Sequence, residues 1–214
     1  MKVEKIVDLS LIVGFFLLLT NITVVVAADD SNNREIGIEW VNQYHGTAPD
    51  LTFCDDDAVG FYNHLGSTGF TRRFNFGDDL AWESDFERTG VGGHDDIYVD
   101  TLDFAYFSGH GSPDGFYFGT NYDGDGNFPF MVHSGPGSPQ TYEAQWGDID
   151  LEWIFISACQ VLYENGIWDR LWYVFNGLHG VTGFHTVEAD TPDLGRFFAY
   201  YLTDTWGPYC IGDA

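Results

Sequence analysis

Hydrophobic residues occur in short runs along the chain, and segments with helical spacing separate these runs. Five runs rich in aliphatic and aromatic residues predict strands, at residues 36–41, 70–76, 102–107, 151–156 and 178–186. Further segments predict helices, at residues 58–65, 81–88, 167–175 and 194–203. Strands that alternate with helices form mostly parallel sheets covered on both faces, so the expected fold class is α/β with a mostly parallel central sheet.

Two local signals refine the predicted helices. Asp55, Asp56 and Asp57 precede the first of them, and acidic residues at this place cap a helix start and favour its dipole. Trp168 and Trp172 have helical spacing in the third predicted helix, so we assign both side chains to the core.

The N-terminus has the organisation of a secretory signal peptide. Lys2 and Lys5 precede an apolar run over residues 9–26, and small residues suited to signal peptidase end at Ala28. Because this segment contains no twin-arginine pair, we expect export by the general secretory route to the extracellular space or the cell surface. The apolar run is also long enough for an uncleaved anchor, and residues 9–26 are the only membrane contact we expect.

The chain therefore divides into three expected parts. Residues 1–28 are the signal peptide, residues 29–35 are a polar link, and residues 36–214 form a single domain. A domain of this length buries a core of ordinary size and leaves no room for a second catalytic module.

The charge of the chain is strongly negative. It carries 33 Asp and Glu against 8 Lys and Arg, which gives a net charge of −25. Such a surface repels phosphate backbones, so nucleic acid is excluded as a partner. The composition is typical of halophilic proteins, because high salt screens the self-repulsion, but an acidic secreted protein without that adaptation fits as well.

The chain has three cysteines, and an odd number leaves at least one thiol unpaired in an oxidising compartment. Cys159 follows an apolar strand, Cys54 precedes a predicted helix, and Cys210 lies near the C-terminus. The simplest assignment is a disulfide between Cys54 and Cys210 with Cys159 free, although the sequence leaves the other pairings open.

Two predicted strands end in residues suited to nucleophilic catalysis. His110 and Cys159 each follow an apolar strand by a few residues, and catalytic groups of parallel sheets collect beyond the carboxyl ends of the strands. On neighbouring strands the thiol would lie beside a base that takes its proton, as acyl transfer requires. Gly109 and Gly111 let the backbone turn sharply, so the N–H groups of Gly111 and Cys159 are candidate donors of an oxyanion hole.

These blocks resemble those of the caspase-like cysteine peptidases, the fold shared by caspases, legumain, gingipains and clostripain. Residues 102–111 end in Ser-Gly-His-Gly, and residues 153–159 end in Ser-Ala-Cys. The chain is also similar to a secreted prokaryotic family with the same blocks. The resemblance implies a three-layer caspase-like fold, His110 as the base, Cys159 as the nucleophile, and the N–H groups of Gly111 and Cys159 as oxyanion donors.

The expected function is that of a secreted cysteine endopeptidase that hydrolyses a protein or peptide substrate and requires no cofactor. Asp100 or Asp103 could orient the imidazole, although a solvated acid also fits either position. Caspases and legumain select their substrates with basic pocket residues, and no arginine of this chain aligns with them, so the side-chain preference stays open. The alternative is a non-catalytic binding or cell-surface module on the same scaffold.

A long segment between the two blocks, residues 112–148, is rich in Gly, Pro and aromatic residues, and we expect a hairpin near residues 116–118. Within it, Asn121, Asp123 and Asp125 alternate as in the first half of a calcium loop. The twelfth position lacks the bidentate Glu of an EF-hand, so a structural calcium site and an acidic turn are both compatible with the pattern.

Overall fold

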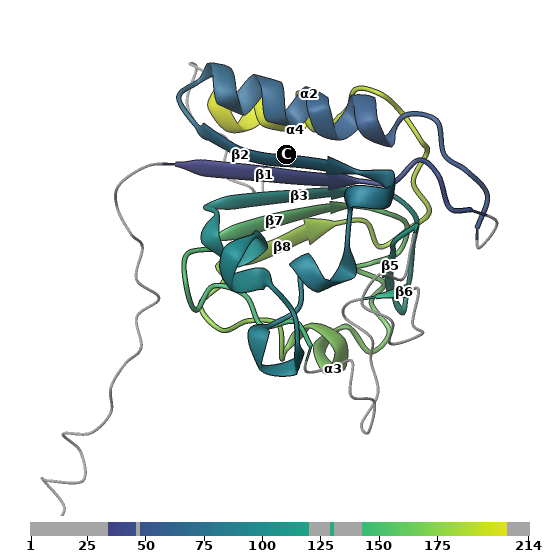
Figure 1. Ribbon diagram of the computed structural model, residues 1–214. Coiled ribbons are helices and arrows are strands. Elements are labelled where there is room, and N and C mark those ends of the chain that lie inside the picture. Colours follow the sequence, from purple (N-terminus) through teal and green to yellow (C-terminus); the bar gives the residue numbers. More distant parts are fainter. Residues whose placement is uncertain (1–33, 46–47, 120–128, 131–142, 205–214) are drawn as a thin grey trace, which may run out of the picture.

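A computed structural model describes residues 34–45, 48–119, 129–130 and 143–204 of the chain. Its centre is a sheet of five parallel strands (Figure 1), in the spatial order β2, β1, β3, β7, β8. The strands are β1 (Glu35–Trp40), β2 (Thr71–Gly77), β3 (Phe104–Ser108), β7 (Trp153–Ser157) and β8 (Gly180–Gly183). Strands β3 and β7 are neighbours, so the strands that precede His110 and Cys159 lie side by side.

Two helices cover one face of the sheet (Figure 1). They are α2 (Cys54–Ser67) and α4 (Leu194–Thr203). Phe61 of α2 stacks on Tyr106 of β3 with ring centroids 4.6 Å apart, and Phe198 of α4 lies 4.4 Å from the ring of Phe155 on β7. These buried aromatic pairs hold both helices over the two central strands, each pair being worth about 0.5–1.5 kcal/mol beyond the area it buries.

Short elements cover the opposite face (Figure 1). They are the helix α3 (Ile167–Leu171) and five 3-10 turns, η1 (Asp78–Leu80), η2 (Glu83–Asp85), η3 (Thr89–Val91), η4 (Asp95–Ile97) and η5 (Val99–Thr101). A small antiparallel sheet follows β3 and contains β4 (Gly111–Ser112), β5 (Gly115–Tyr117) and β6 (Pro129–Phe130). Phe86, Phe107, Phe116 and Trp146 form the core beneath these elements.

The three layers confirm the expected α/β class and are consistent with a caspase-like fold. The predicted strands and the helix at 194–203 are present, and a hairpin joins β4 to β5 near the expected place. Residues 81–88 are an exception, because they contain a single 3-10 turn, η2, instead of the predicted helix. Residues 83–87 are all buried, and an amphipathic helix would expose one side of such a run.

The start of α2 differs from the prediction in a way that affects the site. Phe53 is the N-cap residue and makes no side-chain cap, so the acidic residues that follow lie inside the first turn and do not cap the helix. Asp55 and Asp56 are not buried, whereas Asp57 is only 2% exposed. The carboxylate of Asp57 accepts hydrogen bonds from Ser108 and Ser157, the last residues of β3 and β7. The sequence therefore indicated the helix correctly but assigned Asp57 the wrong role.

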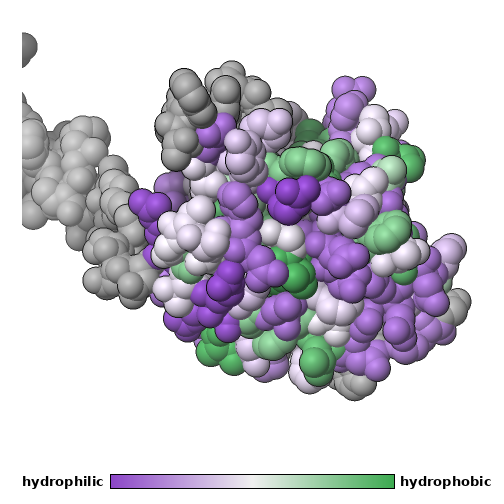
Figure 2. Space-filling view, turned by 90° about the horizontal axis from the view of Figure 1, so that it is seen from above, coloured by the Kyte–Doolittle hydropathy of each residue, from purple (hydrophilic) through white to green (hydrophobic). Residues whose placement is uncertain are grey.

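The assignment of Trp168 and Trp172 to the core was wrong, because they are 74% and 67% exposed. Helix α3 ends at Leu171, and the side chain of Leu171 is buried in the core instead. On the face seen from above, over α2 and α4, hydrophilic residues predominate and hydrophobic ones are scattered (Figure 2). Within the described ranges, no helix has the length and apolarity needed to span a bilayer.

Candidate active site

The register of the sheet brings the two predicted catalytic residues to one edge. Ser108 at the end of β3 pairs with Ser157 at the end of β7, and His110 and Cys159 each stand two residues further along the chain. The ladder continues past the strands, because the Gly109 N–H donates to the Ser157 carbonyl at 3.1 Å. His110 and Cys159 consequently line the same pocket, which has a volume of about 250 Å³.

The backbone and ring of His110 rest on Tyr44, a buried residue of the segment after β1. The His110 N–H donates to the Tyr44 hydroxyl at 2.7 Å, and the two ring centroids are 4.7 Å apart. The hydroxyl in turn donates to the Tyr117 carbonyl of β5 at 3.3 Å. Burial raises the pKa of Tyr44 far above its usual value, so this hydroxyl stays neutral and able to donate.

A backbone carbonyl orients the imidazole. Nε2 of His110 lies 2.7 Å from the Pro49 oxygen, and a carbonyl oxygen only accepts hydrogen bonds, so Nε2 carries the proton. In neutral histidine the other nitrogen, Nδ1, is then the basic one. The Pro49 segment is itself anchored, because the Asp50 carboxylate accepts the Tyr44 N–H at 2.9 Å and the Leu51 N–H donates to Asn42 at 2.9 Å.

Neither acid considered as an orienting group contacts His110. Asp100 accepts hydrogen bonds from the backbone N–H groups of Gly147 and Ile149, and Asp103 accepts one from Glu35 at the beginning of β1. Both acids precede β3, whereas His110 follows it, so the length of the strand separates them from the imidazole. The suggestion that one of them orients the ring was wrong.

The thiol of Cys159 is free and partly exposed. The Glu188 N–H points to its sulfur at 3.3 Å, and the Glu188 carbonyl lies 3.7 Å from the same atom. These two backbone contacts hold the sulfur atom at the edge of the pocket. The segment after β8 therefore forms one wall of the pocket and touches the candidate nucleophile with its backbone.

Gly111 lies directly against the backbone of Cys159. A Cβ atom at Gly111 would lie 3.0 Å from the Cys159 nitrogen and only 2.5 Å from its oxygen, and the second distance is shorter than real Cβ atoms show. Only glycine lets β4 come this near to the turn after β7. The two residues predicted to supply oxyanion donors are thus adjacent, as a shared oxyanion hole requires.

Three acidic residues line the pocket, and they are Asp57, Glu188 and Asp190. Asp57 accepts hydrogen bonds from the hydroxyls of Tyr106, Ser108 and Ser157 at 2.8–3.0 Å, yet burial still raises its pKa. Burial and the neighbouring charge of Asp57 raise the pKa of Glu188 to about 7. The floor of the pocket is therefore acidic, and ionising both the Asp57 and the Glu188 carboxyl groups costs free energy.

A comparison with protein families bears on the chain as a whole. A family model described as a domain of unknown function (DUF6345) matches residues 38–213, from within β1 to beyond α4. The chain belongs to this DUF6345 family. A comparison with curated proteins found no match.

The candidate site of the DUF6345 domain contains a second thiol. Cys54 at the start of α2 is buried, lines the pocket and forms no disulfide with another described residue, and burial raises the pKa of its thiol to about 12. A thiol with so high a pKa is protonated and unreactive at neutral pH. Cys210, the partner expected for a disulfide with Cys54, lies outside the described residues, so the bridge stays a prediction.

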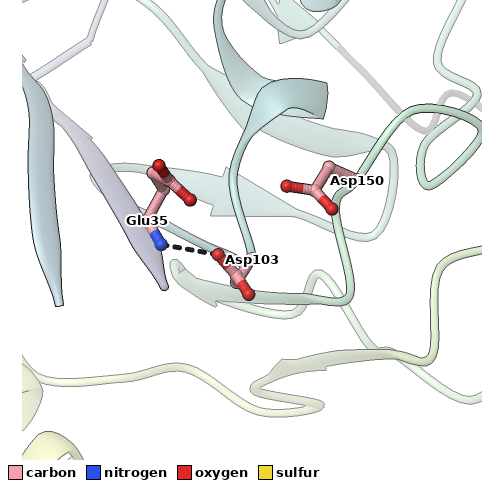
Figure 3. Close-up of side chains that lie close together, drawn as sticks. All are labelled: Glu35, Asp103 and Asp150. Atoms are coloured by element: carbon pink, nitrogen blue, oxygen red, sulfur yellow. Dashed lines mark hydrogen bonds between the residues drawn. The ribbon is translucent and has the colours of Figure 1, made fainter. Parts of the chain in front are cut away.

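The residues considered for calcium, Asn121, Asp123 and Asp125, also lie outside the described part of the DUF6345 domain. Among the described residues, two acidic clusters have the composition that a hard cation prefers. One contains Glu35, Asp103 and Asp150, whose carboxylates lie near one another at the amino ends of the strands (Figure 3). The other contains Glu83, Glu87 and Glu143. Their carboxylate oxygens lie within 4.8 Å of one another in each cluster.

Sequence reasoning identified the two reactive residues of the DUF6345 domain but missed those that position them. Tyr44 and Pro49 lie in a polar segment with no periodic pattern, so nothing in the sequence linked them to His110. Glu188 follows the last strand of the sheet and was not singled out, although the carboxyl edge of every strand is a place to expect site residues.

Proposed function

We propose that the chain is a secreted cysteine peptidase that hydrolyses peptide bonds with His110 and Cys159. One observation carries the proposal: a free thiol and an imidazole with its Nδ1 available as a base line the same pocket beyond neighbouring strand ends. The resemblance to caspase-like peptidases supports the same function, and the three-layer fold is consistent with that resemblance. The expected leader at residues 1–28 supports export.

The first half of the reaction forms a thioester. Nδ1 of His110 takes the proton from Sγ of Cys159, and the thiolate attacks the carbonyl carbon of the scissile peptide bond. The carbonyl oxygen becomes an oxyanion, which the N–H groups of Gly111 and Cys159 stabilise. The oxyanion then reforms the carbonyl, the C–N bond breaks, and the imidazolium gives its proton to the leaving amine.

The second half of the reaction restores the enzyme. His110 takes a proton from a water molecule, and the resulting hydroxide attacks the thioester carbonyl. The C–S bond breaks, the carboxylic acid product leaves, and the sulfur receives the proton back from the imidazolium. No electron transfer occurs in either half, so the reaction needs only peptide and water as reactants.

Thiol labelling tests the proposal before any substrate is known. The purified protein is treated under native conditions with a peptidyl acyloxymethyl ketone, and the alkylated cysteine is identified by mass spectrometry. We expect rapid labelling at Cys159 and slow labelling at Cys54, because the thiol of Cys54 is buried and protonated. We expect His110→Ala to slow labelling by at least about 100-fold, the lower end of what a positioned base contributes.

A matched control is available in His179, which is exposed at the amino end of β8 and lies outside the pocket. His179→Ala should leave the labelling rate unchanged, and circular dichroism should show that both variants fold. In parallel, a peptide library is incubated with the protein and with Cys159→Ala, and products are read by mass spectrometry. Slow labelling of Cys159 that does not depend on His110, with no cleavage of any peptide, would favour a binding module instead.

A further inference from the structure

We propose that the pocket beside Cys159 receives the cationic side chain of an arginine or lysine residue, and that the peptide bond following this residue is the one cleaved. This inference rests on the proposed function, since it names the substrate class of the same site. It is carried by a cavity that adjoins the nucleophile and by the kind of residue that lines it.

The position of the pocket decides which part of a substrate enters it. Glu188 contacts the sulfur of Cys159 with its backbone and lines the pocket. Its carboxylate accepts a hydrogen bond from the hydroxyl of Ser157 at the floor of the pocket. When the carbonyl carbon of a substrate residue is bonded to Cys159, the side chain of that same residue therefore lies beside Glu188. The volume of about 250 Å³ is below the roughly 300–1,000 Å³ that enclose whole drug-sized ligands, and it suits a single side chain.

The floor of this pocket has an excess of negative charge. Ser157 lies between the carboxylates of Asp57 and Glu188, at 3.0 Å from the first and 3.2 Å from the second. A hydroxyl has only one hydrogen, so it can satisfy only one of the two carboxylates at a time. Asp57 has further donors in the hydroxyls of Tyr106 and Ser108, whereas the carboxylate of Glu188 shares the Ser157 hydroxyl with it. The charges of Asp57 and Glu188 therefore repel each other in the pocket.

Neither lysine nor arginine is among the described residues that line the pocket, so no permanently charged side chain of the protein offsets this negative charge. Arg196 is the nearest arginine along the chain to the segment that carries Glu188, and it pairs with Asp193 at 2.9 Å. Asp190 adds a third carboxylate, which the backbone N–H groups of Thr52 and Phe53 hold at 2.7 and 3.1 Å. A substrate cation would supply the missing positive charge.

The walls suit the rest of such a side chain. Leu51, Val187 and Ala189 line the pocket with apolar groups, and lysine and arginine place their methylene stems along such surfaces while the charged end stays in a polar environment. An aspartate or glutamate in the same place would meet only like charge. The lining therefore rejects acidic side chains and accepts basic ones.

The test compares two substrates of nearly the same shape. Fluorogenic peptides end in either arginine or citrulline before the scissile bond, and citrulline replaces the guanidinium by a neutral urea group. We expect kcat/KM to be at least about tenfold higher for the arginyl peptide, which corresponds to about 1.4 kcal/mol. A third peptide with aspartate at the same position should be the poorest substrate.

Variants assign the preference to the pocket. Glu188→Gln keeps the size of the side chain and removes its charge, so the ratio of arginyl to citrullinyl kcat/KM should fall several-fold. Glu164→Gln is the matched control, since Glu164 is exposed and lies outside the pocket, and it should leave the ratio unchanged. Arginyl and citrullinyl acyloxymethyl ketones provide the same comparison through the rate of Cys159 alkylation, without turnover.

The outcomes separate this inference from the proposed function. Rapid labelling or cleavage with no preference for arginine over citrulline, or with a preference for aspartate, overturns the cationic pocket while the peptidase stands. A failure of every peptide and every electrophile to react at Cys159 overturns both. A preference for arginine that Glu188→Gln leaves intact would show that the charge of the pocket does not select the substrate.

Discussion

Tyr44 connects parts of the site that are far apart in the sequence. Its hydroxyl accepts a hydrogen bond from the backbone of His110 and donates one to Tyr117, and its own N–H is held by Asp50, next to the Pro49 carbonyl that fixes the imidazole. Tyr44 thus holds the backbone of His110 and also the loop whose Pro49 carbonyl sets the tautomer of the imidazole. Such support is what keeps a catalytic group within the narrow geometry that proton transfer requires.

Glu188 should make substrate preference depend on pH. Burial, with a contribution from Asp57, raises its pKa to about 7, so it is protonated and neutral below this pH and charged above it. The attraction for a cationic side chain therefore strengthens as the pH rises. We expect the ratio of arginyl to citrullinyl kcat/KM to increase several-fold between about pH 6 and pH 8.

A ratio is the appropriate measurement, because any change with pH in the chemical step itself affects both substrates equally and cancels. Neither arginine nor citrulline changes its charge in this range, so the slope reports the protein alone. In Glu188→Gln the ratio should be lower and independent of pH, whereas Glu164→Gln should retain the slope. A ratio that stays constant with pH in the unmodified protein would contradict the assignment of this titration to the pocket.

Among the secondary-structure elements, the contact between β4 and the turn after β7 is the one on which the oxyanion hole depends. Gly111→Ala would place a methyl group 2.5 Å from the Cys159 oxygen and 2.8 Å from the Cβ of Ala158. Either β4 or the Cys159 turn must move to relieve that overlap. Overpacking of this kind costs about 1–3 kcal/mol of folding stability, and we expect it to lower kcat by at least about tenfold.

Gly90 provides the control for this substitution. A Cβ atom at Gly90 would have no neighbour within 4 Å, so Gly90→Ala adds the same methyl group in open space. Its kcat and thermal stability should match those of the unmodified protein. If Gly111→Ala were as active as Gly90→Ala, the close approach of β4 to Cys159 would have no catalytic role.

The elements that the sequence predicted well are those with a strong local pattern. The strand before Cys159 is a continuous apolar run, and the helix at 194–203 has an apolar side at helical spacing, so each appears close to its predicted place. The failure at residues 81–88 has a tertiary cause. The backbone N–H of Trp82 donates to the buried Glu39 of β1, and the five residues after Trp82 are all buried. No local sequence pattern predicts either feature.

The same distinction applies to the site. His110 and Cys159 could be predicted because each follows a recognisable strand, and the parallel arrangement places strand ends at one edge. The Pro49 carbonyl could not, because a backbone group in an irregular loop has no sequence signal. The pairing of Asp57 with Glu188 through Ser157 joins three separate segments, and only the folded chain brings them together.

Over the whole molecule, the net charge of −25 is accompanied by several buried carboxyl groups on the side of the sheet away from α2. Burial raises the pKa of Asp85 to about 6, of Asp95 to about 7 and of Asp100 to about 8. In the unfolded chain such groups titrate near pH 4. Between about pH 6 and pH 8 the folded protein therefore binds more protons than the unfolded chain, so its stability must fall as the pH rises.

Thermal unfolding at high salt tests this expectation. In about 1 M KCl the screening length is about 3 Å, so repulsion between surface charges is largely removed while buried groups are screened much less. We expect Tm to be several degrees lower at pH 8 than at pH 6, since about 1 kcal/mol shifts Tm by about 2–4 °C in a protein of this size. Asp100→Asn removes the group with the highest of these pKa values and should reduce the difference, whatever its effect on Tm itself. An equal or higher Tm at pH 8, or a difference that Asp100→Asn leaves unchanged, would mean that these carboxyl groups do not release their protons on the folded protein in this range.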